Sequence, residues 1–395
     1  MDVDAILKAA LFTPGAKGRW GLPVIFIGPP GSSKTQRVET FAKHHGLHAE
    51  VLIGSIREPT DIGGLARLED NHFRLMPPVW AKTLGEKKHG VVVLDELNCN
   101  VAAMQAAMLR LATDGAVGEY MLPPTIRIIA MMNRVEEAAG GWDLSPPLAN
   151  RFGHLNWDVP SVADWSSWLL SGAEEPETKQ TAADIEACVM EEWDAHFAKA
   201  KGVVTSFLRA KPGLLHKMPP PNSPDAGKAF PTPRSWEMAT RAMAGGTLHK
   251  LALGDAQLFV AGFIGLGAAS ELFSFMKKLD LPNPSDILDG TVVFKHNPKR
   301  PDVTLAVLSS CAALVVPATA PQRAQRAEVL WDITNKVADD AADISVQAAM
   351  ALVQCGLIVG KPALEAMTKL QPILLAAGFS RNALLPKMST FAKTL

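Results

Sequence analysis

A lysine and a threonine placed directly after a short glycine-rich turn are the first residues of this sequence that could do chemistry. The stretch VIFIGPPGSSKTQ, residues 24–36, begins with apolar residues typical of a strand and ends in a pattern typical of a helix. In such a turn, small residues let backbone N–H groups face a phosphate, and the helix N-terminus adds its positive end. Lys34 would reach the outer phosphates, and the Thr35 hydroxyl would reach Mg²⁺. This context favours a phosphate site over a plain turn.

Ser33 stands where phosphate loops of this kind usually have a glycine before the lysine. A serine costs little there if residue 33 has ordinary helical dihedral angles, because a small Cβ then meets no clash. On that condition Ser33 is compatible with a functional site.

Two carboxylates follow the next strong strand pattern, VVVLDE at residues 91–96. Asp95 would hold Mg²⁺ or its waters, and Glu96 would polarise the attacking water as a base. The pair could instead cap the following helix, but its coupling to the phosphate loop favours the catalytic interpretation. Asn133 ends a later strand pattern; its amide would orient a water, although asparagine is also a common turn residue.

The nucleotide site predicted from these motifs comprises one loop and three residues that follow strands. We expect Thr35 and Asp95 to hold Mg²⁺, and Glu96 and Asn133 to take part in the reaction. We expect the nucleotide to contact Gly28, Pro29, Pro30, Gly31, Ser32, Ser33, Lys34, Thr35, Gln36 and Asp95.

Short apolar runs alternate with helical periods up to about residue 160, which predicts a mostly parallel sheet between helices. Beyond Pro160 the strand signals fade, and helical patterns dominate. The expected strands cover 23–27, 49–54, 90–96, 125–133 and 153–159, and the expected helices include 33–46, 101–115, 161–170, 182–200, 233–244 and 255–279.

Composition narrows the class of protein. The chain has 395 residues, 48% of them apolar and 20% charged, with a formal net charge of -1. This balance argues against a broad basic surface for nucleic acid or an anionic membrane. The longest uncharged run, residues 303–320, contains Thr, Ser and Pro, so we expect a buried helix ending at Pro317 and no membrane span. Together with an acidic N-terminus, this predicts a soluble cytoplasmic protein.

The loop, the acidic pair and Asn133, in this order, resemble the AAA+ ATPases. Three further segments are similar to the MoxR branch of that family: GGWDLSPPLANRFGHLNWDVP at 140–160, FPTPRSWEM at 230–238, and TDIGGLARLEDNHFRLMPP at 60–78. In that branch, the first carries an arginine finger, the second begins a lid helix with a sensor-2 arginine, and the third is a hairpin inserted into helix 2. A small residue in place of the glycine is also common there, which fits Ser33.

The resemblance implies a three-part organisation. An α/β AAA+ core of the P-loop type, with a parallel sheet between helices, would cover residues 1–160 and include the insert near 60–78. An all-α lid would follow at 161–290, and a C-terminal helical extension at 291–395.

The resemblance also implies that the protein hydrolyses ATP with Mg²⁺. Arg151 would be the finger that reaches the ATP of a neighbouring subunit, and Arg234 would contact the phosphates of its own subunit. A finger that acts on a neighbour implies a ring, here a hexamer. MoxR-type proteins are remodelling or maturation factors, commonly paired with a von Willebrand A-type protein. We expect such a partner to be separate, with a protein complex as client. Arg134 lies near this site with no assigned role.

Three alternative functions stay open. The chain could be a scaffold that binds ATP without useful turnover, although the Asp95–Glu96 pair argues against this. It could be a chelatase-like motor subunit, a closely related class. A nucleic-acid motor is disfavoured by the neutral charge.

Overall fold

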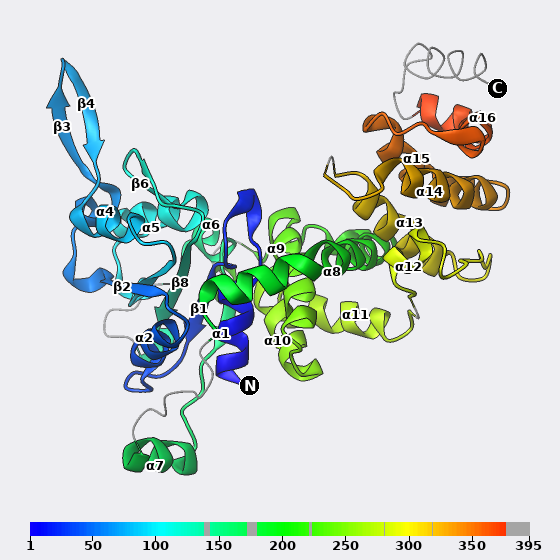
Figure 1. Cartoon of the computed structure of the whole chain (residues 1–395). Helices are drawn as coiled ribbons and strands as arrows, with labels where there is room; N and C mark the ends of the chain where they lie inside the picture. Colours follow the sequence, from blue (N-terminus) through cyan, green and yellow to red (C-terminus); the bar gives the residue numbers. More distant parts are fainter. Residues whose placement is uncertain (138–142, 172–179, 221–222, 280, 318, 377–395) are drawn as a thin grey trace. The chain divides into compact units, whose positions relative to one another are not determined.

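The computed structural model describes residues 1–137, 143–171, 180–220, 223–279, 281–317 and 319–376 (Figure 1). These residues form two compact units. The first comprises Met1–Trp193 with Gly213–Glu271, and the second comprises Asp194–Pro212 with the described residues from Leu272 onward.

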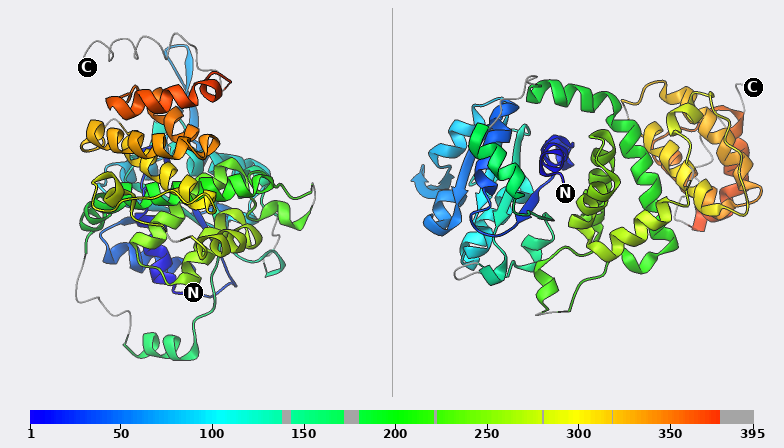
Figure 2. Two further views of the ribbon diagram at one scale, coloured as in Figure 1. Left: turned by 90° about the vertical axis from the view of Figure 1, so that its right-hand side faces the viewer. Right: turned by 90° about the horizontal axis from the view of Figure 1, so that it is seen from below.

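A five-stranded parallel sheet is the centre of the first unit, in the order β2-β5-β8-β1-β9. Its strands are rich in aliphatic residues on both faces, and all seven residues of β8 are buried. Such strands need cover on both sides, and helices flank the sheet (Figures 1 and 2). The parallel α/β core predicted from the sequence is therefore confirmed. The strands are β1 (Val24–Ile27), β2 (His48–Ile53), β5 (Gly90–Asp95), β8 (Ile126–Met132) and β9 (Gly153–Asn156).

Helices and two small hairpins complete the first unit. Gly115 ends α5 in a left-handed conformation, with φ of 66°, as its position after the helical pattern predicts. The helices are α1 (Val3–Phe12), α2 (Lys34–His44), α3 (Pro59–Gly63), α4 (Val79–Gly85), α5 (Ala102–Asp114), α6 (Pro146–Ala149), α7 (Val162–Ser171), the beginning of α8 (Ala182–Ala210), α9 (Pro233–Leu248) and α10 (Leu253–Ile264). The hairpins pair β3 (Leu65–Glu69) with β4 (His72–Met76) and β6 (Ala116–Val117) with β7 (Tyr120–Met121).

The β3–β4 hairpin lies in the insert suggested by the sequence and extends away from the sheet (Figure 1). Asp70 and Asn71 form its tip with positive φ values of 47° and 60°. Leu68 pairs directly with Phe73, and their exposed fractions are 62% and 78%. Since side chains alternate between the faces of a strand, this face of the hairpin is apolar and open.

One expected helix is two helices in the structure. The pattern at 255–279 reads as continuous, but α10 ends before Gly265 and α11 (Leu266–Met276) follows. Gly265 has φ of 79° and its N–H bonds to Ala261 O, which ends α10. The glycine is the physical cause of the break, and the single-helix expectation is wrong.

The second unit is helical and has its own apolar core. Trp331 is fully buried there, and its Nε1 donates to Leu357 O at 2.7 Å. The predicted helix at 303–320 is α13 and ends at Val315, close to the expected Pro317. Among the described residues, no helix is long and apolar enough to cross a membrane. The helices from α12 onward are α12 (Pro284–Leu288), α13 (Pro301–Val315), α14 (Arg323–Ala338), α15 (Ala342–Gln354) and α16 (Gly360–Ala376).

The division into core, lid and extension stays a prediction. The described structure of the expected extension ends at residue 376, so its residues 377–395 lie outside the described chain. Residues 138–142, which overlap the start of the finger segment, lie outside it as well.

Candidate functional site

Lys34 lies at the end of the loop between β1 and α2, at the carboxyl edge of the sheet. Its Nζ donates to Gly28 O and Pro29 O, both at 2.9 Å, and to Asn133 Oδ1 at 3.0 Å. Burial lowers the pKa of Lys34, and the charge of Asp95 opposes that shift. Two predicted site residues from different strands therefore meet, at an ammonium group that already has three oxygen acceptors.

Thr35 and Asp95 also meet at this edge. Thr35 Oγ1 donates to Asp95 Oδ2 at 2.7 Å, and Asp95 Oδ1 accepts from the backbone N–H of Glu96 at 2.8 Å. A hydroxyl and a carboxylate are oxygen ligands of the kind that Mg²⁺ prefers. The donor set therefore fits the magnesium site expected from the sequence. The other loop residues lie in the same turn or in the first turn of α2: Pro30, Gly31, Ser32 and Gln36.

Glu96 is held by a residue that the sequence did not single out. Its carboxylate accepts a hydrogen bond from the Ser55 hydroxyl, just beyond β2. Its backbone is left-handed, with φ of 55° and ψ of 39°, which costs a non-glycine residue about 1–3 kcal/mol. The available signal for Ser55 was its place two residues after the parallel strand β2, since the residues that follow parallel strands share one edge of the sheet.

Asn133 is fixed from two sides. Its side-chain oxygen accepts from Lys34, and its backbone O accepts from Asn98 Nδ2 at 2.9 Å. Asn98 is fully buried and was not among the predicted residues. The neighbouring Arg134 forms an ion pair with Glu137 at 3.7 Å, with about half of its side chain exposed. Asn133 thus lies beside Lys34 in the candidate site, and Arg134 is paired with a neighbouring glutamate.

Ser33 does not have the helical dihedral angles at which a serine would cost little. Its φ of 57° and ψ of 28° are left-handed, and it is the residue from which α2 begins. The chain must turn sharply to bring the helix N-terminus towards the loop, and glycine adopts this conformation without a steric penalty. The Cβ of Ser33 is therefore strained, and the surrounding loop imposes the strain.

Trp157, just beyond β9, packs against the phosphate loop. It is fully buried, stacks edge-on against Phe26 with ring centroids 5.3 Å apart, and donates from Nε1 to Ser32 O at 3.2 Å. A Cβ added to Gly28 would lie 2.3 Å from Trp157 O, so only glycine fits at that close approach. This shape requirement explains the first glycine of the loop.

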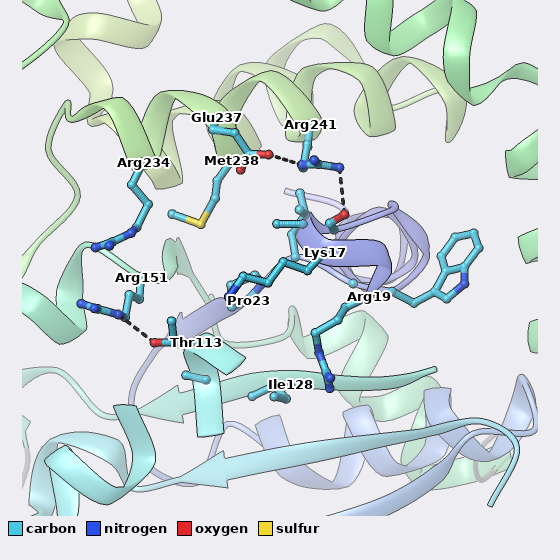
Figure 3. Close-up of a pocket in the computed structure, with 16 residues that line it drawn as sticks. Lys17, Arg19, Pro23, Thr113, Ile128, Arg151, Arg234, Glu237, Met238 and Arg241 are labelled. Carbon is cyan, nitrogen blue, oxygen red and sulfur yellow. Dashed lines mark hydrogen bonds and ion pairs between the residues drawn. The ribbon is translucent and has the colours of Figure 1, made fainter. Parts of the chain in front are cut away.

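A cavity of about 280 Å³ lies at the opposite edge of the same sheet (Figure 3). Leu22 and Pro23, which precede β1, line it, whereas the phosphate loop follows the other end of β1. Five cationic side chains line it: Lys17, Arg19, Arg151, Arg234 and Arg241.

Three of the five cations have structural partners. Arg19 donates to the carbonyl groups of Leu122, Pro123 and Ile126. Arg241 pairs with Glu237 and donates to Pro14 O and Gly15 O, and Lys17 pairs with Asp114. These contacts fix α9 and the loop before β1. Arg151 also has hydrogen-bond partners, but it and Arg234 are the two arginines predicted from the sequence to contact a phosphate, so they are the candidates for binding an anion.

Arg151 lies two residues before β9, whose first residue pairs with the first residue of β1. Its Nε donates to Thr113 Oγ1 at 2.8 Å and its Nη1 to Pro147 O at 2.5 Å. Burial lowers its pKa, and the charge of Arg234 lowers it further. Arg151 and the phosphate loop are separated by the length of β1, about 10 Å for a four-residue strand.

Arg234 is in the second position of α9, and its guanidinium lies at the same end of the cavity as that of Arg151 (Figure 3). The sequence-based expectation was that Arg234 reaches the phosphates of its own subunit. The structure brings it beside Arg151, at the amino edge, because α9 packs on α1 and contributes its first turns to the cavity. That Arg234 contacts the phosphates of its own subunit stays a prediction.

Comparison with known protein families matches one part of the chain. Residues 23–152 match the model of the AAA domain, dynein-related subfamily. The chain contains an AAA domain of the AAA+ ATPases. The matched range begins at the strand before the phosphate loop and ends just after Arg151, so it includes Lys34, Asp95 and Asn133. An AAA domain is a nucleotide-binding domain, which agrees with the contacts at the carboxyl edge.

Two further comparisons were made with curated proteins and with solved structures. No curated protein matches the sequence. Among solved structures, the fold is similar to that of a "putative ATPase" from Cytophaga hutchinsonii, with 15% sequence identity and a TM-score of 0.43. That match covers 70% of this chain and 87% of the other.

Proposed function

We propose that the AAA+ protein hydrolyses ATP in a ring, with each active site built from two subunits. The observation that supports this is the separation of charges across the sheet. Lys34, Thr35 and Asp95 meet at one edge, while Arg151 and Arg234 share a cavity at the other. Side chains separated by the sheet cannot serve one nucleotide within a subunit, but they can meet when a second copy docks edge to edge.

Each residue at the carboxyl edge has a role that its contacts allow. Lys34 would exchange its carbonyl partners for the outer phosphates, and Thr35 and Asp95 would hold Mg²⁺. The metal ion would neutralise charge on the phosphates when bound. Glu96 would leave Ser55 to polarise the attacking water, and Asn133 would orient it.

Arg151 and Arg234 would both act on the nucleotide of the neighbouring subunit. A guanidinium that approaches the transferred phosphoryl group stabilises charge in the transition state, and arginine fingers are worth several orders of magnitude in rate. Because Arg234 lies beside Arg151 in the cavity, we assign it to the same neighbour's site.

We further propose that the protein is a MoxR-type remodelling factor that works as a hexamer. The hairpin in the insert and the position of Arg151 support this. Its client would be another protein complex, with a separate von Willebrand A-type protein as partner. A chelatase-like motor or a nucleotide-gated scaffold is the alternative; phosphate release would exclude the scaffold, and stimulation by DNA would support a nucleic-acid motor.

Mixed rings test the two-subunit site. Lys34→Ala should lose ATP binding but keep its arginines, and Arg151→Ala should bind ATP and hydrolyse it poorly. Co-expression of the two should restore activity, because a Lys34→Ala subunit supplies Arg151 to a neighbour that still has Lys34. The measurement is phosphate release at a protein concentration that populates rings. Mixed rings with no more activity than either variant alone would sink the proposal.

A second experiment tests whether the β3–β4 hairpin contacts the client or partner. We expect replacement of residues 66–74 by a short Gly/Ser link to spare ATP affinity and to abolish stimulation by a copurified partner. Phe73→Ser should reproduce part of that loss because it removes the most exposed apolar side chain of the hairpin. Arg74→Ser, on the other face, is the matched control. Full partner-dependent activity in the deletion would contradict the role.

A further inference from the structure

Asn150 directly precedes Arg151 and is buried, with 9% of its surface exposed. Its side chain lies between the finger loop and the start of α9. Oδ1 accepts from Thr232 Oγ1 at 2.9 Å, and Nδ2 donates to Phe230 O at 3.4 Å. One side chain therefore joins two segments about 80 residues apart in the sequence.

Thr232 is the N-cap of α9 and lies two residues before Arg234. Its hydroxyl accepts from the backbone N–H of Ser235 at 3.1 Å, and Ser235 Oγ accepts from the backbone N–H of Thr232 at 2.8 Å. Ser235 Oγ donates to Phe230 O at 2.8 Å. The Thr232 hydroxyl has a single proton and two acceptors within reach, and Asn150 Oδ1 at 2.9 Å is closer than Ser235 Oγ at 3.2 Å. The N-cap residue of α9 is thus hydrogen-bonded both within its capping box and to Asn150.

The finger loop and α9 each have other contacts, but none of these within the described part of the chain joins the two segments to each other. Arg151 donates to Thr113 and Pro147, and α9 is held by Arg241 at the carbonyl groups before β1. The Asn150–Thr232 bond is different, because it fixes the finger loop directly to the first turn of α9. The bond joins residues that lie next to Arg151 and close to Arg234 in the sequence, and the positive charges of these two arginines repel each other.

We propose that Asn150 is a positioning residue that fixes Arg151 and Arg234 relative to each other, so that both enter the neighbouring subunit's site as one unit. This inference rests on the proposed two-subunit site. Asn150 touches no nucleotide; it acts through the two guanidinium groups. Loss of its hydrogen bonds lets the finger loop and α9 shift separately, and a displacement of about 1 Å at a catalytic group can cost a hundredfold in rate.

The substitution Asn150→Ala can be placed on either side of an active site in mixed rings, which separates positioning from folding. In the first mixture, Lys34→Ala/Asn150→Ala is combined with Arg151→Ala. Its active sites receive their arginines from the subunit that lacks Asn150. In the control mixture, Lys34→Ala is combined with Arg151→Ala/Asn150→Ala. The same substitution is present, but the arginines come from subunits with an intact Asn150.

We expect kcat for phosphate release to fall about tenfold or more in the first mixture, relative to Lys34→Ala with Arg151→Ala, and to stay within about twofold in the control mixture. The KM for ATP should be similar in both, because the phosphate loops are unchanged. Thr232→Val in place of Asn150→Ala should give the same asymmetry, and Thr232→Ser, which keeps the hydroxyl, should not. The cost of the double substitution should be smaller than the sum of the two single costs, because each single substitution already breaks the Asn150–Thr232 bond.

Equal losses in the two mixtures would overturn the inference, because they would show an effect on folding or assembly. Unchanged activity in the first mixture would overturn it too. An inactive parent mixture of Lys34→Ala with Arg151→Ala would overturn the two-subunit site itself, and the inference with it. Because these three results differ, a failure of the Asn150 inference can be distinguished from a failure of the proposed two-subunit site.

Discussion

The two edges of the parallel sheet differ in how their charges are compensated. At the carboxyl edge, Lys34 has three oxygen acceptors within 3.0 Å, and Thr35 bonds to Asp95. At the amino edge, Arg151 and Arg234 lie together in a cavity whose carboxylate, Glu237, is paired with Arg241. The cation at the carboxyl edge is surrounded by oxygen acceptors, whereas the one carboxylate that lines the cavity is already paired with a third arginine. This difference supports the proposal that the phosphate loop of one subunit and the arginines of a second subunit form one site.

The largest expected effect concerns the stability of the amino edge. Arg127, near the start of β8, is fully buried and pairs with Glu186 of α8, which also bonds to His89 at 3.2 Å. Glu186→Ala leaves a buried guanidinium without its counter-ion, so we expect a loss of about 3–5 kcal/mol in the free energy of unfolding. Urea titration of the isolated protein measures this loss.

Glu186→Gln is the control, since it keeps an acceptor for Arg127 and should lose less. ATP affinity of the folded fraction should not change in either variant, because the phosphate loop lies at the other edge. A stability change below about 1 kcal/mol in Glu186→Ala would show that the ion pair does not anchor this edge.

The next effect concerns chemistry at the carboxyl edge. Glu96→Gln should retain ATP and lower hydrolysis about a hundredfold, because an amide cannot act as a base. Glu137→Gln, a nearby acid outside the predicted site, is the matched control and should hydrolyse at close to the parent rate. Nucleotide affinity and single-turnover phosphate release distinguish binding from chemistry. Near-parent hydrolysis by Glu96→Gln would remove Glu96 from the role of base and weaken the contrast between the edges.

The smallest effect concerns the strained loop. Ser33→Gly removes the left-handed strain but frees the unfolded chain, so we expect a stability change within about 1 kcal/mol and hydrolysis within a few-fold of the parent. Ser33→Val should be clearly less stable, because a β-branched residue tolerates positive φ poorly. Thermal unfolding ranks the three proteins. A valine variant as stable as the parent would contradict the left-handed conformation.

Local patterns in the sequence were sufficient for the sheet and for the residues at its carboxyl edge. The aliphatic run at 91–94 and the turn chemistry after Ile27 depend on neighbours within a few residues. Parallel strands end at one edge, so Lys34, Asp95 and Asn133 had to lie close together once the strands were recognised. Gly115 ended its helix as predicted for the same local reason.

Tertiary packing decided the features that depend on distant segments. The loop imposes a left-handed backbone on Ser33, although the residue type predicts otherwise. Ser55 meets Glu96, and Asn150 meets Thr232, through contacts between segments far apart in the chain. Arg234 lies beside Arg151 because α9 packs on α1, and no motif records where a helix docks. The sequence alone determined which chemical groups follow each strand, because that information is local; the direction in which Arg234 faces was set by packing between distant helices.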